Sequence, residues 1–120
     1  MVSLRQRLRQ LRTSVYDLDL EQLRSFCTSQ PDVTPIAEAA PRRVVTVAGE
    51  ITSLRIVPRA GFPSLEATVS DGSGSVVAVW TGRRQIAGIS PGRRLLLTGR
   101  GAPMGPVGRL TIFNPDYELL

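Results

Sequence analysis

Arginine is the chemically most informative residue type in this 120-residue sequence, because it supplies every basic side chain. Before residue 40 the sequence has five arginines and five acidic residues, so the net charge of this part is zero. From residue 40 onward it has ten arginines and five acidic residues, so the whole formal net charge of +5 lies in this part. The guanidinium group is a planar fork that matches phosphate and stacks on bases. The excess therefore favours a polyanionic partner for this part of the chain, with GC-rich coding as the alternative explanation for the arginines.

The arginines of the basic part gather in three places that also contain turn residues or an apolar side chain. These are RIVPRAGFP (residues 55–63, with Arg55, Arg59 and Phe62), GRR (82–84, with Arg83 and Arg84) and RGAPMGPVGR (100–109, with Arg100 and Arg109). A groove that follows a phosphate backbone needs charge beside an apolar or mobile surface. These seven residues are the candidate phosphate- and base-contacting set, although arginine pairs are also common on solvated surfaces.

Residue types for catalysis and metal binding are scarce. The sequence has no histidine, and its one cysteine, Cys27, excludes an internal disulfide and the usual zinc sites. Residues 70–73 (SDGS) are better explained by turn geometry than by a nucleophile. Glu50 and Glu66 are the one carboxylate pair that neighbouring strands could bring together, without other signs of a substrate pocket. We expect a protein that is not an enzyme and has no metal or cofactor.

Two segments precede the basic part. Residues 1–29 contain apolar residues at helical spacing and two helix-start signatures, at residues 3–6 and 19–22, which predict one or two amphipathic N-terminal helices. The apolar stripe of the first consists of Leu4, Leu8, Leu11 and Val15. Residues 30–41 are predicted to form a linker, because their prolines remove backbone donors and favour extended conformations.

From residue 42 the hydrophobic period changes from helical to alternating, as is typical of strands. Five strands are predicted, at residues 45–56, 65–70, 75–81, 93–99 and 109–113, with a short helix within residues 82–88. The turn at residues 71–74 joins the second strand to the third. Gly49 is placed to bend the long first strand, because a glycine inside a strand often marks a corner.

This order of elements predicts a mainly β fold, the five-stranded OB-fold Greek-key barrel with a short helix between strands 3 and 4. A small open sandwich is the alternative. An OB barrel binds single strands across the outer face of strands two and three and through the loops joining strands one to two and four to five. Residues 55–63 and 100–109 occupy those loops and residues 83–84 follow the third strand. The three arginine-rich places therefore belong to one predicted binding side.

Four stretches of the sequence together resemble a known family. They are VTVAGEI (45–51), LEATVSDGSGSVVAVW (65–80), GRRQIAGISPGRRLLLTGR (82–100) and NPDYELL (114–120). In this order they resemble small actinobacterial OB-fold nucleic-acid-binding proteins and, more distantly, the wedge OB domain of RecG-type branch-migrating helicases. The resemblance implies nucleic-acid binding without catalysis, and the GxxxxGK[ST] phosphate-binding loop of a motor domain is absent from the sequence.

The number of aromatic side chains limits the affinity that we expect for single-stranded nucleic acid. Single-strand binders stack bases on aromatics of the sheet, each base being worth about 1–3 kcal/mol, whereas this chain is poor in aromatics. Trp80 alternates with Val76 and Ala78, so we expect it in the core, with stacking as the alternative if the register is shifted by one residue. Glu66, on the predicted outer face, would repel phosphate. Weak, mainly electrostatic binding follows.

The sequence thus predicts a non-catalytic protein that binds single-stranded or branched DNA or RNA. The alternative is a protein interaction or oligomerisation module that uses the barrel and the N-terminal helices, whose apolar stripe a small barrel need not cover. A cytoplasmic location is expected, because the cysteine content suits a reducing compartment and no secretory signal or bilayer-length apolar span occurs. The arginines at 5, 7, 9 and 12 resemble a transit peptide only faintly.

Overall fold

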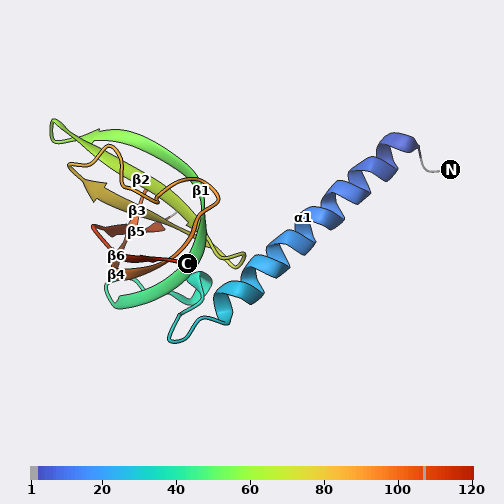
Figure 1. Cartoon of the computed structure of the whole chain (residues 1–120), viewed down its shortest axis with the longest axis horizontal. Coiled ribbons are helices and arrows are strands. Elements are labelled where there is room, and N and C mark those ends of the chain that lie inside the picture. Colours follow the sequence, from blue (N-terminus) through green and yellow to red (C-terminus); the bar gives the residue numbers. More distant parts are fainter. Residues whose placement is uncertain (1–2, 107) are drawn as a thin grey trace.

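The computed structural model (Figure 1) describes residues 3–106 and 108–120, and it gives the backbone but not the side chains of residues 5–14. The N-terminal elements are helix α1 (Leu4–Thr28) and the 3-10 helix η1 (Ile36–Glu38). The strands are β1 (Val44–Arg59), β2 (Phe62–Ser70), β3 (Ser75–Thr81), β4 (Arg94–Met104), β5 (Arg109–Phe113) and β6 (Asp116–Leu119).

Five of the strands close into a ring. The order of hydrogen-bonded neighbours is β1, β2, β3, β5 and β4, and β4 pairs again with β1. All of these pairs are antiparallel except β3 with β5, and β6 adds an antiparallel partner to β4. The predicted mainly β architecture with a five-stranded ring is confirmed.

The length and curvature of β1 make the ring possible. Residues 44–50 pair with β4, residues 50–59 pair with β2, and a register shift between Ile51 and Ser53 lies just after the change of partner. A Cβ added to Gly49 would collide with Val69 Cγ1 and lie 2.9 Å from the Ser70 carbonyl oxygen. Glycine is therefore required at this bend for close packing against β2.

Alternating apolar residues fill the interior of the ring. Their buried side chains come from all the long strands, as binary patterning predicts, and the fully buried ones include Val47, Val69, Val76, Leu95 and Leu97. The first and last residues of β3 and β5 are the ones predicted from the sequence. β1, β2 and β4 are longer than predicted, so most of the two predicted arginine-rich loops is strand.

The structure has one of the one or two predicted N-terminal helices and lacks the predicted helix after the third strand. Residues 4–28 form a single helix, because no glycine or proline interrupts them and the helical spacing continues through the second start signature. Residues 82–93 form turns and irregular structure, with no helix between β3 and β4. Gly82, Gly88 and Gly92 in that segment have positive φ angles, which a right-handed helix does not allow.

The segment between α1 and β1 is bound to the barrel. The buried side chain of Ile36 belongs to the barrel core cluster. Its backbone N–H donates to Asp71 Oδ2 at 2.8 Å, and Asp71 Oδ1 accepts from the backbone N–H groups of Ser73 and Gly74. Asp71 therefore holds the β2–β3 turn and the predicted linker together.

Helix α1 contacts the barrel through its C-terminal part. Leu23 and Cys27 are buried with Ala48 of β1 in a small second cluster, beside Phe26. The Arg94 guanidinium lies over the Phe26 ring, 4.5 Å from its centre. The N-terminal part of α1 extends away from the strands (Figure 1). Within residues 3–106 and 108–120, no helix is long and apolar enough to cross a membrane.

Candidate nucleic-acid interface

The outer surface of β2, β3 and β5, together with the end of β1, forms the candidate interface. The residues on either side of Glu66 lie in the core cluster, so the Glu66 side chain points outward. Cross-strand pairing then joins Glu66 to Arg55 and to Val79, and Val79 to Phe113. With Arg59, which shares the face of Arg55, these residues define what we call the sheet face.

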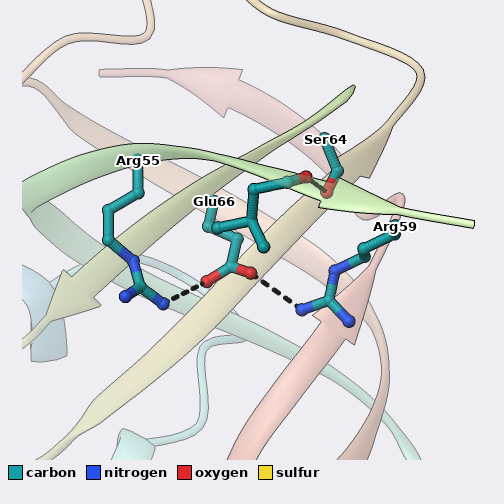
Figure 2. A network of polar contacts seen from close by, with 5 residues as sticks. Arg55, Arg59, Ser64 and Glu66 are labelled. Atoms are coloured by element: carbon teal, nitrogen blue, oxygen red, sulfur yellow. Dashed lines mark hydrogen bonds and ion pairs between the residues drawn. The ribbon is translucent and has the colours of Figure 1, made fainter. Parts of the chain in front are cut away.

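Glu66 lies between two arginines on the sheet face (Figure 2). Arg55 Nη2 donates to Glu66 Oε1 at 2.9 Å, and Arg59 Nη2 donates to Glu66 Oε2 at 2.8 Å. The Glu66 side chain is buried by this arrangement, whereas that of Arg55 is largely exposed. The three residues together carry one net positive charge. Glu66 therefore does not present the uncompensated negative charge that the sequence predicted.

The arginines also control the protonation of Glu66. Burial alone would raise the pKa of its carboxyl group, but the hydrogen bonds and charges of Arg55 and Arg59 outweigh burial and hold the pKa below its ordinary value of 4.5. The carboxylate is consequently ionised at neutral pH. Both guanidinium groups are held by a fixed charge in the unbound protein.

Arg59 reaches across the sheet face to an aromatic ring. Its guanidinium carbon lies 5.4 Å from the centre of the Phe113 ring on β5, within the range of a cation–π contact. Val79, on the strand between β2 and β5, is fully buried. The Phe113 side chain keeps 39% of its surface exposed. An exposed aromatic beside a guanidinium is an arrangement on which a base can stack.

A second aromatic marks one end of the sheet face. Phe62, the first residue of β2, is 69% exposed. It lines an open hollow of about 360 Å³ with Arg59, Ala60, Pro63, Thr81 and Gly82. Arg83 and Arg84, both exposed, follow Gly82 directly, and the Gly82 N–H donates to the Pro63 carbonyl oxygen. Two predicted places, residues 55–63 and 82–84, are thus brought together.

The third predicted place lies along β4 and β5. Arg109 is exposed and shares the outward face of β5 with Phe113, four residues or about 13 Å along the strand. Arg100 is exposed on β4, next to Gly101, whose partner Ile112 precedes Phe113. Arg109 therefore lies toward the end of the sheet face away from Arg83 and Arg84, whereas Arg100 lies on the neighbouring strand β4, about level with Phe113.

Trp80 is not available for stacking. It is only 6% exposed, its Nε1–H donates to the Pro115 carbonyl oxygen at 3.3 Å, and Tyr117 packs edge-on against it with 5.8 Å between the ring centres. The structure supports the core interpretation of Trp80. The alternative register, which would have turned the ring outward, is wrong.

The candidate carboxylate pair is separated. Glu50 lies opposite Ser70 and accepts a 3.4 Å hydrogen bond from Arg94, whereas Glu66 lies opposite Arg55. Ser70 and Glu66 are four residues, or about 13 Å, apart along β2, so the two acids do not form a pair. Residues 3–106 and 108–120 contain no cluster of three His, Cys, Asp or Glu side chains that would hold a metal ion.

Phe113 is the interface residue that sequence reasoning missed. Its alternation with Arg109 along β5 was a usable signal, since residues 109, 111 and 113 must share a face. The position of Phe113 beside Glu66 and Arg59 could not be predicted from the sequence, because it depends on the parallel pairing of β5 with β3, two strands that are distant in the sequence.

Comparison with known proteins supports the fold. No protein-family model and no curated protein matches the sequence. Among solved structures, RecG bound to a three-way DNA junction is 22% identical with a TM-score of 0.59, over 72% of this chain and 12% of the RecG chain. The S. pombe Stn1–Ten1 complex is 21% identical with a TM-score of 0.52, over 65% of this chain and 58% of that one.

An OBody bound to hen egg-white lysozyme is also similar, with 20% identity and a TM-score of 0.58 over 77% of this chain and 97% of the OBody. This chain spans about an eighth of the RecG chain and under two thirds of the Stn1–Ten1 chain. At these identities the similarity establishes the OB-type barrel fold.

Proposed function

We propose that this chain is a non-catalytic OB-fold protein that binds single-stranded or branched nucleic acid through the sheet face. Binding is weak and largely electrostatic. The observation that carries the proposal is the position of Phe113, an exposed aromatic with Arg59 over its ring and further arginines on both sides along the strands. Cytoplasmic location belongs to the same proposal.

Charge and aromatic content together account for the proposed strength. The sheet face offers two exposed rings, Phe62 and Phe113, on which bases can stack at about 1–3 kcal/mol each. Arg83, Arg84, Arg100 and Arg109 are exposed and offer phosphate contacts. Arg55 and Arg59 contribute less in the unbound state, because Glu66 neutralises one of their two charges. Phosphate contacts of this kind carry no sequence information, so little sequence preference is expected.

The solved structures with this fold support the proposal and also its alternative. RecG holds a three-way DNA junction in its structure, which is a branched nucleic acid. The OBody binds a folded protein, lysozyme. Docking of a protein on the same barrel is therefore the second candidate function, and the arginine arrangement favours nucleic acid over it.

The proposal that the protein is not catalytic rests on the side chains that could act as nucleophiles, acids or bases. The sequence has no histidine. Burial of Cys27 between α1 and the barrel raises the pKa of its thiol to about 11, so the thiol is protonated at neutral pH and is a poor nucleophile. Asp71 is engaged in the turn hydrogen bonds already described. None of these groups faces the sheet face.

The test removes exposed arginines that no carboxylate depends on. Arg83→Ala with Arg84→Ala removes two charges beside Phe62, and Arg24→Ala with Arg93→Ala removes two exposed charges elsewhere, on α1 and before β4. The slope of log affinity against log salt should fall by about 1.4 in the first variant, at about 0.7 per lost phosphate contact with a single strand. The second variant should keep most of the slope. Equal effects of the two variants would contradict the placement of the site.

A further inference from the structure

The apolar side chains that the structure describes in the N-terminal part of α1 are exposed to solvent. The described contacts of α1 with the barrel lie in its C-terminal part, where Leu23, Cys27 and Phe26 pack on the barrel and Leu20 and Arg24 lie close to Gly72 of the β2–β3 turn. Further toward the N-terminus, Leu4, Val15 and Leu18 are 73%, 56% and 52% exposed. This part of the helix extends away from the barrel (Figure 1). Helices in water derive most of their stability from tertiary packing, so an extended amphipathic helix without packing calls for a partner.

The continuity of α1 makes its apolar spacing a heptad pattern. Because the helix does not break near residue 18, Leu18 continues the stripe formed by Leu4, Leu8, Leu11 and Val15, and the spacing alternates four and three residues throughout. That spacing is the seam of a coiled coil. Leu23 lies about 120° around the helix from Leu11 at 3.6 residues per turn. The buried contacts Leu23 and Cys27 therefore lie off the seam, whereas Phe26, about 60° from Leu11, borders it.

The charges on α1 are divided along its length. Its first half carries Arg5, Arg7, Arg9 and Arg12 and no acid, whereas the following stretch carries Asp17, Asp19 and Glu21 and no base until Arg24. Two parallel copies would place arginine beside arginine. Two antiparallel copies would place each basic half beside an acidic stretch. Like charges side by side disfavour a pairing and opposite charges favour it.

One antiparallel register satisfies the seam and the charges together. When Leu11 faces Val15 of the second copy, Leu8 faces Leu18 and Leu4 faces Gln22. In the same register Arg5, Arg7 and Arg9 lie level with Glu21, Asp19 and Asp17 of the second copy. We propose that α1 pairs with α1 of a second copy of this chain as an antiparallel two-stranded coiled coil.

This pairing sets the positions of the two barrels. Each barrel follows the C-terminal end of its own α1, and the antiparallel arrangement directs those ends apart. The dimer then holds two sheet faces at opposite ends of a shared helical pair. The proposal concerns the helix alone and does not depend on what the sheet face binds.

Sedimentation analysis of the whole chain tests the association. The expected mass rises with concentration toward twice the 13.0 kDa of one chain. Leu11→Glu places a charge in the seam and should abolish the rise, whereas Thr13→Glu, on the opposite side of the helix, should leave it intact. A constant monomer mass for the wild-type chain, or equal behaviour of the two variants, would overturn the proposal.

Charge exchange tests the same pairing without an apolar change. Reversal of Arg5, Arg7 and Arg9 to Glu, or of Asp17, Asp19 and Glu21 to Arg, should each prevent self-association, and mixing the two variants should restore a dimer. Loss of helix in a variant is monitored by circular dichroism. Failure of the mixture to associate while both variants remain helical would contradict the electrostatic pairing.

Disulfide trapping tests the direction of the helices. An equimolar mixture of Leu4→Cys and Gln22→Cys chains should form a mixed disulfide, because positions 4 and 22 face each other. Gln22→Cys alone should not cross-link with itself, since the two cysteines would be about 27 Å apart along the helix pair at 1.5 Å per residue. Efficient cross-linking of Gln22→Cys alone would show a parallel pair and overturn the proposal. The native Cys27 is buried and serves as the unreactive background.

Discussion

The guanidinium carbon of Arg59 lies 5.4 Å from the centre of the Phe113 ring, so β1 and β5 are in contact over the outer surface of the barrel. The same guanidinium donates to Glu66, which also accepts from Arg55. One acid therefore holds two arginines and, through one of them, touches the exposed aromatic ring. Any ligand that binds the sheet face must compete with Glu66 for these arginines.

Replacement of Glu66 should consequently strengthen nucleic-acid binding. Glu66→Gln removes the negative charge on the sheet face and leaves both guanidinium groups to bind phosphate. One unit-charge interaction at contact distance in a water-like dielectric is worth about 1 kcal/mol, so affinity should rise about fivefold at low salt. The change is measured by fluorescence anisotropy with a labelled single strand. Glu118→Gln, an equal charge change on exposed β6, should have little effect, and weaker binding by Glu66→Gln would argue against the site.

The Glu66 network should also appear in the pH dependence of stability. The pKa of Glu66 is lower in the folded chain than its ordinary 4.5, so its ion pairs stabilise the fold above pH 4.5 and that contribution is lost as the pH falls through the folded pKa. Urea unfolding near neutral pH should show wild type more stable than Glu66→Gln by about 1 kcal/mol, since Arg55 is largely exposed. The gap should close in acid. A gap independent of pH would show that the carboxylate charge is not responsible.

Most of the fold was predictable because it depends on local alternation and turn chemistry. Residues 75–81 and 109–113 were predicted with the limits that the structure shows, since each is a short apolar run between turn residues. The inward position of Trp80 follows from the same alternation. The capping signature at Asp19, which allowed a second N-terminal helix, starts no new helix, because such a signature is only a local preference. Continued helical spacing and the anchoring of Leu23 and Cys27 override it.

The site was predictable in its residue types and only partly in its geometry. The arginine-rich segments 55–63 and 82–84 meet at one end of the sheet face because the topology places the ends of β1 and β3 together. The ion pairs of Glu66 depend on the β1–β2 register, and the proximity of Arg59 to Phe113 depends on the pairing of β3 with β5. Both relationships involve long-range pairing, which sequence periodicity does not encode.

The turn at Asp71 should be important for stability. Its carboxylate accepts hydrogen bonds from the Ile36 backbone N–H and from both the N–H and the hydroxyl of Ser73. Asp71→Ala leaves these buried or half-buried donors unpaired, at a cost of about 2–4 kcal/mol in unfolding free energy. Asp116→Ala, at an exposed position on β6, is the matched control and should change stability little. Chemical denaturation measures both, and similar stabilities would refute the assigned role.

The fluorescence of Trp80 should report the folding of the protein and not the binding of nucleic acid. Trp80 is the only tryptophan in the sequence, and its side chain is buried beside Tyr117. Its emission should be blue-shifted and protected from acrylamide in the native chain, and it should shift to red on unfolding. Addition of single-stranded DNA should leave the emission nearly unchanged, because no base reaches the ring. Strong quenching by DNA in proportion to saturation would show that a base does stack on Trp80.

The central claim, electrostatic binding of nucleic acid at the sheet face, is tested most directly by anisotropy titrations of labelled single-stranded and forked DNA and RNA at two salt concentrations. For three phosphate contacts with a single strand, affinity should fall roughly twentyfold between about 50 and 200 mM salt. Binding that is detectable and loses affinity to this extent is the result that the account predicts. Absence of binding at the lower salt concentration, or an affinity that salt does not change, would contradict it.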